Sequence, residues 1–91
     1  MEDSRPSTAG PFDKAVAGAL RAATAQRFMT QTEVAEKTGI SIRTLARYYK
    51  GTSPLPIGKL VDIAQALGMP ASEIVEAAQA IARQAQEDGG R

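Results

Sequence analysis

The 91-residue chain contains no cysteine and no histidine, and its only aromatic residues are two phenylalanines and two tyrosines. Without cysteine it can form neither disulfides nor thiolate metal sites, and without histidine it lacks the commonest general base and transition-metal ligand of proteins. We therefore expect no enzymatic activity, no metal site and no cofactor. Because hydrophobic residues still make up 43% of the chain, we expect a small core packed from aliphatic side chains.

Long hydrophobic runs are also missing. No segment approaches the roughly 20 apolar residues of a membrane-spanning helix, and the first ten residues, MEDSRPSTAG, lack the apolar stretch of a secretory signal. The sequence therefore predicts a cytoplasmic protein. Residues 1–10 and 87–91 have little to bury, so we expect a flexible N-terminal arm and a flexible C-terminal tail around one domain at residues 11–86.

Negative charge is absent from the middle of the chain. The net charge is only +1, but every charged residue between Glu36 and Asp62 is positive. Acidic residues concentrate towards the two ends instead, so a near-neutral protein carries a local basic surface. The positive residues of the middle segment are Lys37, Arg43, Arg47, Lys50 and Lys59.

Apolar residues recur at helical spacing in five segments, and no strand pattern or internal repeat is present. The apolar stripe of the first segment begins with Phe12, and Gly39 and Gly68 follow later segments as typical helix terminators. The sequence thus predicts an all-α, compact five-helix bundle. Its helices are expected at residues 11–27, 31–38, 42–50 and 57–67, and from a cap at Ser72 to the polar QEDGGR segment.

Residues 31–50, QTEVAEKTGISIRTLARYYK, predict two short helices joined by a three-residue turn. Thr30 precedes them with Glu33 three residues on, which is the capping-box pattern. The small side chain of Ala35 lets the second helix approach, and Gly39 tolerates the unusual backbone that the turn requires. This arrangement is typical of the helix-turn-helix motif, which presents its second helix to the major groove of DNA.

The second helix of this motif has two different faces. Leu45, Tyr48 and Tyr49 share the side that is expected to pack on the core, so we assign Tyr48 to the core rather than to a ligand. The opposite side is expected to be exposed, and it carries Ile42, Arg43, Ala46, Arg47 and Lys50.

With these features the chain resembles the helix-turn-helix domain of the lambda-type phage repressors and the xenobiotic-response-element family of bacterial regulators. The resemblance runs from about Leu20 to Val75, and its core is MTQTEVAEKTGISIRTLARYYKG, followed by KLVDIAQALGMPASEIV. It implies a five-helix bundle and a sequence-specific DNA-binding regulator, a bacterial or phage repressor of the immunity type. It also implies double-stranded DNA as the partner, bound as a dimer on an operator with two related half-sites.

The resemblance also implies roles for individual residues. Ile42, Arg43 and Arg47 match positions that read base edges, and we expect Arg43 to be the main reader because a bidentate contact of arginine with guanine is worth about 1–3 kcal/mol of discrimination. Gln31 matches a position at the start of a helix that grips a DNA phosphate. The full set of residues expected to contact the DNA backbone is Gln31, Ser41, Thr44, Lys50 and Thr52.

The chain departs from the family pattern at Tyr49, where many members carry a glutamate that pairs with a basic residue of the first helix. The corresponding position of the first helix is Thr24. We expect an apolar or hydroxyl-bonded packing contact in place of the ion pair.

A second hypothesis is a protein-interaction module, such as an antitoxin or an adaptor, built on the same bundle. The apolar stripe of the last helix extends through Ile81, Ala82 and Ala85, beyond what one small core requires. A homodimer contact or an attached C-terminal domain would cover it. Both kinds of partner are compatible with DNA binding.

Overall fold

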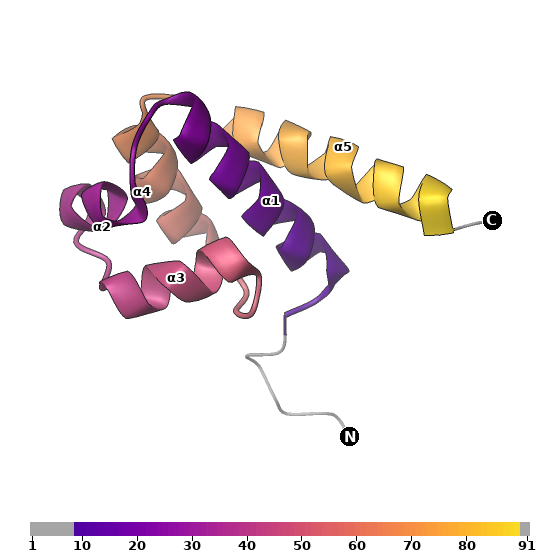
Figure 1. Ribbon diagram of the computed structural model, residues 1–91, viewed down its shortest axis with the longest axis horizontal. Helices are drawn as coiled ribbons and strands as arrows, with labels where there is room; N and C mark the ends of the chain where they lie inside the picture. The colour runs from indigo at the N-terminus through magenta and orange to yellow at the C-terminus, as the bar shows by residue number, and fades with distance from the viewer. Residues whose placement is uncertain (1–8, 90–91) are drawn as a thin grey trace, which may run out of the picture.

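Five α-helices follow one another in the computed structural model, which describes residues 9–89 (Figure 1). No strand is present among these residues, so the all-α, five-helix prediction is confirmed. The expected flexible arm lies outside the described residues, except for Ala9 and Gly10. The helices are α1 (Pro11–Gln26), α2 (Gln31–Thr38), α3 (Ile42–Lys50), α4 (Ile57–Leu67) and α5 (Ala71–Gly89).

The capping signals at the start of α2 are present as predicted. The Glu33 backbone N–H donates to the Thr30 hydroxyl at 3.1 Å, and the Thr30 N–H donates to the Glu33 carboxylate at 2.9 Å. Gly39 then ends α2 with a φ of +78°, in the left-handed region that glycine adopts without strain. Local chemistry therefore fixes both ends of this helix.

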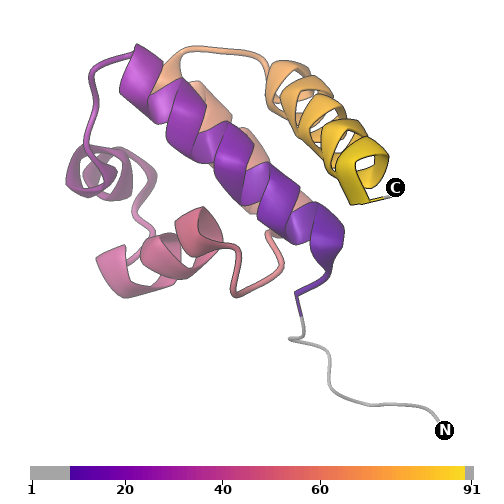
Figure 2. The ribbon, with the colours of Figure 1, turned by 45° about the vertical axis from the view of Figure 1, so that its right-hand side comes forward.

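All five helices contribute to one core. Its largest fully buried side chains are Leu20, Val34, Leu45, Tyr49, Ile63 and Ile74. In Figures 1 and 2, α1 crosses the molecule with α5 beside it on one side and α3 on the other. A β-carbon at Gly18 of α1 would lie 3.4 Å from the Ile81 side chain, so this glycine permits the close approach of α5.

Two expectations for α5 need correction. α5 begins at Ala71 with the Glu73 N–H donating to the Pro70 carbonyl at 3.1 Å, so Ser72 lies inside the first turn instead of capping the helix. α5 also runs on to Gly89, into the segment expected to be a flexible tail. Phe12 is 44% exposed because it lies in the first turn of α1, at the edge of the core.

Candidate nucleic-acid interface

α3 divides its side chains between the core and the surface as the sequence predicted. Ser41 caps its start by accepting the Thr44 N–H at 3.1 Å, and Gly51 ends it with a φ of +78°. Tyr48 is buried, which confirms its assignment to the core. Arg43 and Arg47 are both exposed on the outer side.

The outer face of α3 borders a shallow hollow of about 530 Å³. Three of its lining side chains are cationic, and Ile42, which is 49% exposed, adds an apolar surface beside them. The structure thus brings together all three predicted base-reading residues and two of the predicted backbone contacts. The lining residues are Ile42, Arg43, Ala46, Arg47, Lys50 and Thr52.

Hydroxyl groups lie at both ends of α3. At its start, the Ser41 hydroxyl donates to Thr44 Oγ1 at 3.0 Å, which leaves the Thr44 hydroxyl proton free to donate elsewhere. Beyond its end, the Thr52 hydroxyl donates to the Arg47 carbonyl across a long 3.4 Å bond. A bond of that length is weak and easily exchanged for a better acceptor.

Gln31 lies apart from the α3 hollow. It is the first residue of α2, is half-buried, and lines a separate hollow of about 220 Å³ between α1, α2 and α3. The exposed guanidinium-bearing residue Arg21 of α1 lines the same hollow. Gln31 therefore does not border the hollow that the predicted base-reading residues line.

Tyr49 joins α3 to α1 beneath these surfaces. Its hydroxyl lies 2.7 Å from the Thr24 hydroxyl, and both residues are buried. The hydroxyl-bonded contact expected in place of an ion pair is therefore present. Burial raises the pKa of Tyr49 above its ordinary value of 10.0, while the hydrogen bond with Thr24 acts in the opposite direction.

Arg21 of α1 and Arg27, which directly follows α1, have structural roles that sequence reasoning missed. Arg21 Nη1 donates to the Tyr49 carbonyl at 2.6 Å, and Arg27 Nε donates to the Leu67 carbonyl at 2.8 Å. Each places a positive charge at the C-terminal end of a helix, where the helix dipole favours it. No local signal could have revealed these bonds, because the acceptors lie 28 and 40 residues away in the sequence.

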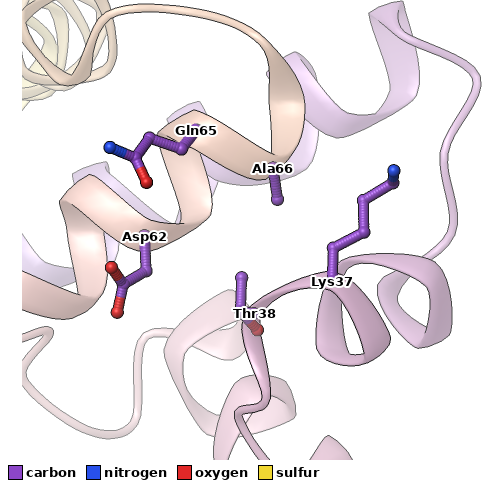
Figure 3. Close-up of a pocket in the computed structure, with 5 residues that line it drawn as sticks. All are labelled: Lys37, Thr38, Asp62, Gln65 and Ala66. Atoms are coloured by element: carbon purple, nitrogen blue, oxygen red, sulfur yellow. The ribbon is translucent and has the colours of Figure 1, made fainter.

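Another hollow, of about 450 Å³, lies between α2 and α4 (Figure 3). Lys37 and Thr38 line it from α2, and Asp62, Gln65 and Ala66 line it from α4. In Figure 3 the Lys37 side chain points away from Asp62. No predicted DNA-contacting residue lines this hollow, and the Asp62 carboxylate makes it unsuited to a phosphate backbone.

Within residues 9–89, no group of three or more acidic residues lies close enough to hold a metal ion. The helices in the same range are too short or too polar to cross a membrane.

Comparison with known protein families gives a match over residues 19–79 to the Cro/C1-type helix-turn-helix DNA-binding domain, well over half of the chain. The chain belongs to this family. The Cro/C1-type domain therefore spans α2, α3 and α4 together with parts of α1 and α5, and the resemblance drawn from the sequence is confirmed. A comparison with curated proteins gives no match.

Two solved structures have the same fold as this Cro/C1-type domain. Both are crystal structures of the clp gene regulator ClgR from Corynebacterium glutamicum. One is 26% identical in sequence with a TM-score of 0.80, covering 90% of this chain and 89% of that chain. The other is 24% identical with a TM-score of 0.74, covering 78% of this chain and 92% of that chain. The family and these neighbours consist of DNA-binding and regulatory proteins and not of enzymes.

Proposed function

We propose that this protein is a sequence-specific transcriptional regulator that inserts α3 into the major groove of an operator. The observation that carries the proposal is the outer face of α3, where Arg43 and Arg47 are exposed beside Ile42. Arginine can make bidentate contacts to guanine, and an apolar side chain can meet the methyl group of thymine. We assign base reading to Ile42, Arg43 and Arg47.

We assign the remaining polar residues of the interface to the DNA backbone. Lys50 and Thr52 border the same hollow as the base-reading residues, and Ser41 and Thr44 lie at the other end of α3. Gln31 would bind a phosphate through its side-chain amide at the start of α2. Contacts of this kind fix the register of the protein on DNA and carry no sequence information themselves.

Selection of bound duplexes from a random DNA pool, followed by affinity measurements over a range of salt concentrations, tests the proposal. We expect a selected consensus with two related half-sites. We also expect about four to six phosphate contacts per subunit, so that log affinity falls with log salt at a slope of roughly −4 to −5. A slope near zero, or a pool without any enriched sequence, would contradict DNA reading by this domain.

We further propose that the regulator is a repressor of the bacterial or phage immunity type, and that it acts in the cytoplasm. A domain that occupies an operator tightly excludes other proteins from the same DNA. A reporter gene with the selected sequence placed across its promoter tests this point, and we expect lower expression when the protein is present. Raised expression would show an activator.

A protein contact is also supported by a specific observation. Pro11, Phe12 and Ala15 of α1 face Ile81, Ala82 and Ala85 of α5 across an open groove of about 680 Å³. Its aromatic residue is 44% exposed and its isoleucine 40% exposed. We assign this groove to a second copy of the chain, because an operator with two half-sites requires two copies. An antitoxin or adaptor that binds another protein there, or an attached C-terminal domain, is the alternative.

A further inference from the structure

Three contacts hold the C-terminal turn of α3 against α1. The Tyr49 hydroxyl shares a 2.7 Å hydrogen bond with Thr24, and Arg21 donates to the Tyr49 carbonyl at 2.6 Å. Gly51 lies so close to α1 that a β-carbon there would come within 3.0 Å of Lys14 Cα. The end of α3 therefore has little freedom to move relative to α1.

Tyr49 lies on the side of α3 opposite to the exposed Arg47. Residues two apart in a helix are separated by about 200° around its axis, so Tyr49 and Arg47 point in nearly opposite directions. Arg21 and Thr24 are three residues apart in α1 and thus share one face of that helix. A rotation of α3 about its own axis would break both of their bonds to Tyr49 and turn Arg47 by the same angle.

The contact between the side chains of Thr24 and Tyr49 is uncharged. Since burial raises the pKa of Tyr49, its phenol stays protonated at neutral pH, and the bond with Thr24 is a neutral hydrogen bond. Salt does not screen such a bond as it screens an exposed ion pair. The contribution of the Tyr49–Thr24 pair to the orientation of α3 should therefore change little with salt concentration.

We propose that Arg21 and Thr24 are positioning residues, which act through Tyr49 to hold α3 at the angle that discriminates between DNA sequences. They set the ratio between specific and non-specific affinity without touching a base. Non-specific affinity depends on the total charge presented to phosphates and tolerates small rotations of α3. Base reading requires aligned hydrogen bonds, so it does not tolerate such rotations of α3. This inference rests on the proposed function.

The decisive experiment uses three changes at the hydroxyl pair. Tyr49→Phe and Thr24→Val each remove one hydroxyl and leave the other buried without a partner, so both should lower stability. The double variant removes both hydroxyls and should regain most of that stability, because no buried group is left unpaired. Thr24→Ser keeps the hydroxyl and serves as the conservative control.

Affinity is measured for a duplex selected by the wild-type protein and for a scrambled duplex of the same composition, at a temperature where circular dichroism shows every variant folded. We expect the ratio of the two affinities to fall at least fivefold in the double variant, equally at low and high salt, with non-specific affinity unchanged. Thr24→Ser should keep the wild-type ratio. A folded double variant that keeps the wild-type ratio of specific to non-specific affinity would show that the hydroxyl pair does not set sequence discrimination, and the inference would fail.

Arg21→Met separates positioning by Arg21 from direct contact with DNA, with Arg83→Met on α5 as a control that removes an equal charge. If Arg21 acts by positioning α3, Arg21→Met should lower the ratio of specific to non-specific affinity and leave the slope of log affinity against log salt unchanged. A phosphate contact predicts loss of affinity for both duplexes and a slope shallower by about 0.9, and that result would overturn the role assigned to Arg21. If the wild-type protein itself does not distinguish the two duplexes, the proposed function fails and the inference fails with it.

Discussion

At the scale of single residues, the exposed side chains of α3 and the side chain at the start of α2 have different chemistry available to them. Arg43 presents a planar, permanently charged group with several donors, which suits the edge of a guanine. Gln31 presents a neutral amide next to the unpaired N–H groups of a helix terminus, which suits a phosphate oxygen. The two residues should therefore affect binding in different ways.

Arg43→Ala should relax the preference for one base pair of the operator, since about 1–3 kcal/mol of discrimination is lost there. Gln31→Ala should weaken binding to all sequences about equally. Competition binding with operator duplexes that carry single base-pair changes, at fixed salt, distinguishes the two patterns. Arg83→Ala on α5 is the control for loss of one exposed charge. The opposite pattern would contradict the roles assigned to these residues.

Phe28 is an unusual residue in the turn between α1 and α2. Its φ is +56°, and it is the only residue other than glycine with a positive φ among residues 9–89. Its side chain is also 94% exposed, so no burial offsets the strain. A left-handed conformation costs a residue with a β-carbon about 1–2 kcal/mol.

Phe28→Gly should stabilise the fold by about 0.5–1 kcal/mol, because glycine adopts this φ freely while gaining some entropy in the unfolded chain. The expected rise in melting temperature is a few degrees for a domain of this size. Phe28→Ala removes the same aromatic ring but keeps the β-carbon, so thermal unfolding should show little gain for it. Equal melting temperatures for the two variants would show that backbone strain is not the cause.

At the scale of helices, α2, α3 and α4 all end at a glycine with a φ between +74° and +78°. Two of these glycines have different surroundings. A β-carbon at Gly39 would meet no atom within 4 Å, whereas one at Gly51 would lie 3.0 Å from Lys14 Cα and 3.3 Å from Ala17 Cβ. Backbone conformation alone therefore requires the first glycine, and helix packing requires the second as well.

Gly39→Ala should lower the free energy of unfolding by about 1–2 kcal/mol, the cost of the left-handed conformation. Gly51→Ala should cost a further 1–3 kcal/mol or so, because α1 must move away from the end of α3. Denaturant unfolding of both variants measures the difference. Equal losses would mean that α1 and α3 separate easily at this point.

The sequence could predict those elements whose limits are set by residues close together in the chain. The limits of α2 and α3 follow from residues a few positions apart, such as Thr30 with Glu33, and so does the exposed face of α3. The bond from Arg21 to α3 and the exposure of Phe12 depend on how α1, α3 and α5 pack, which no local pattern contains. The base contacts were assigned from the family resemblance. They depend on the DNA sequence that is bound, which the selection experiment identifies.

At the scale of the whole molecule, the helices divide into two sides. α3 lies on one side of α1 and α5 on the other (Figures 1 and 2). Residues of α1 and α5 line the open groove described above. A second copy bound at this groove would leave the outer face of α3 free. DNA binding and self-association are therefore compatible in one small domain, and linking two half-site contacts can raise affinity by about 10²–10⁴ without any new contact to DNA.

Ile81→Glu should prevent self-association without unfolding the domain, because the side chain is already 40% exposed and a buried charge at an apolar contact is costly. Ala80→Glu adds the same charge at an exposed position outside the groove and is the matched control. Sedimentation velocity should show a dimer for the wild-type protein and the control, and a monomer for Ile81→Glu. On DNA, Ile81→Glu should lose about 100-fold in affinity for a two-half-site operator and little for a single half-site. A wild-type protein that remains monomeric, both free and on the operator, would leave the groove to a different protein.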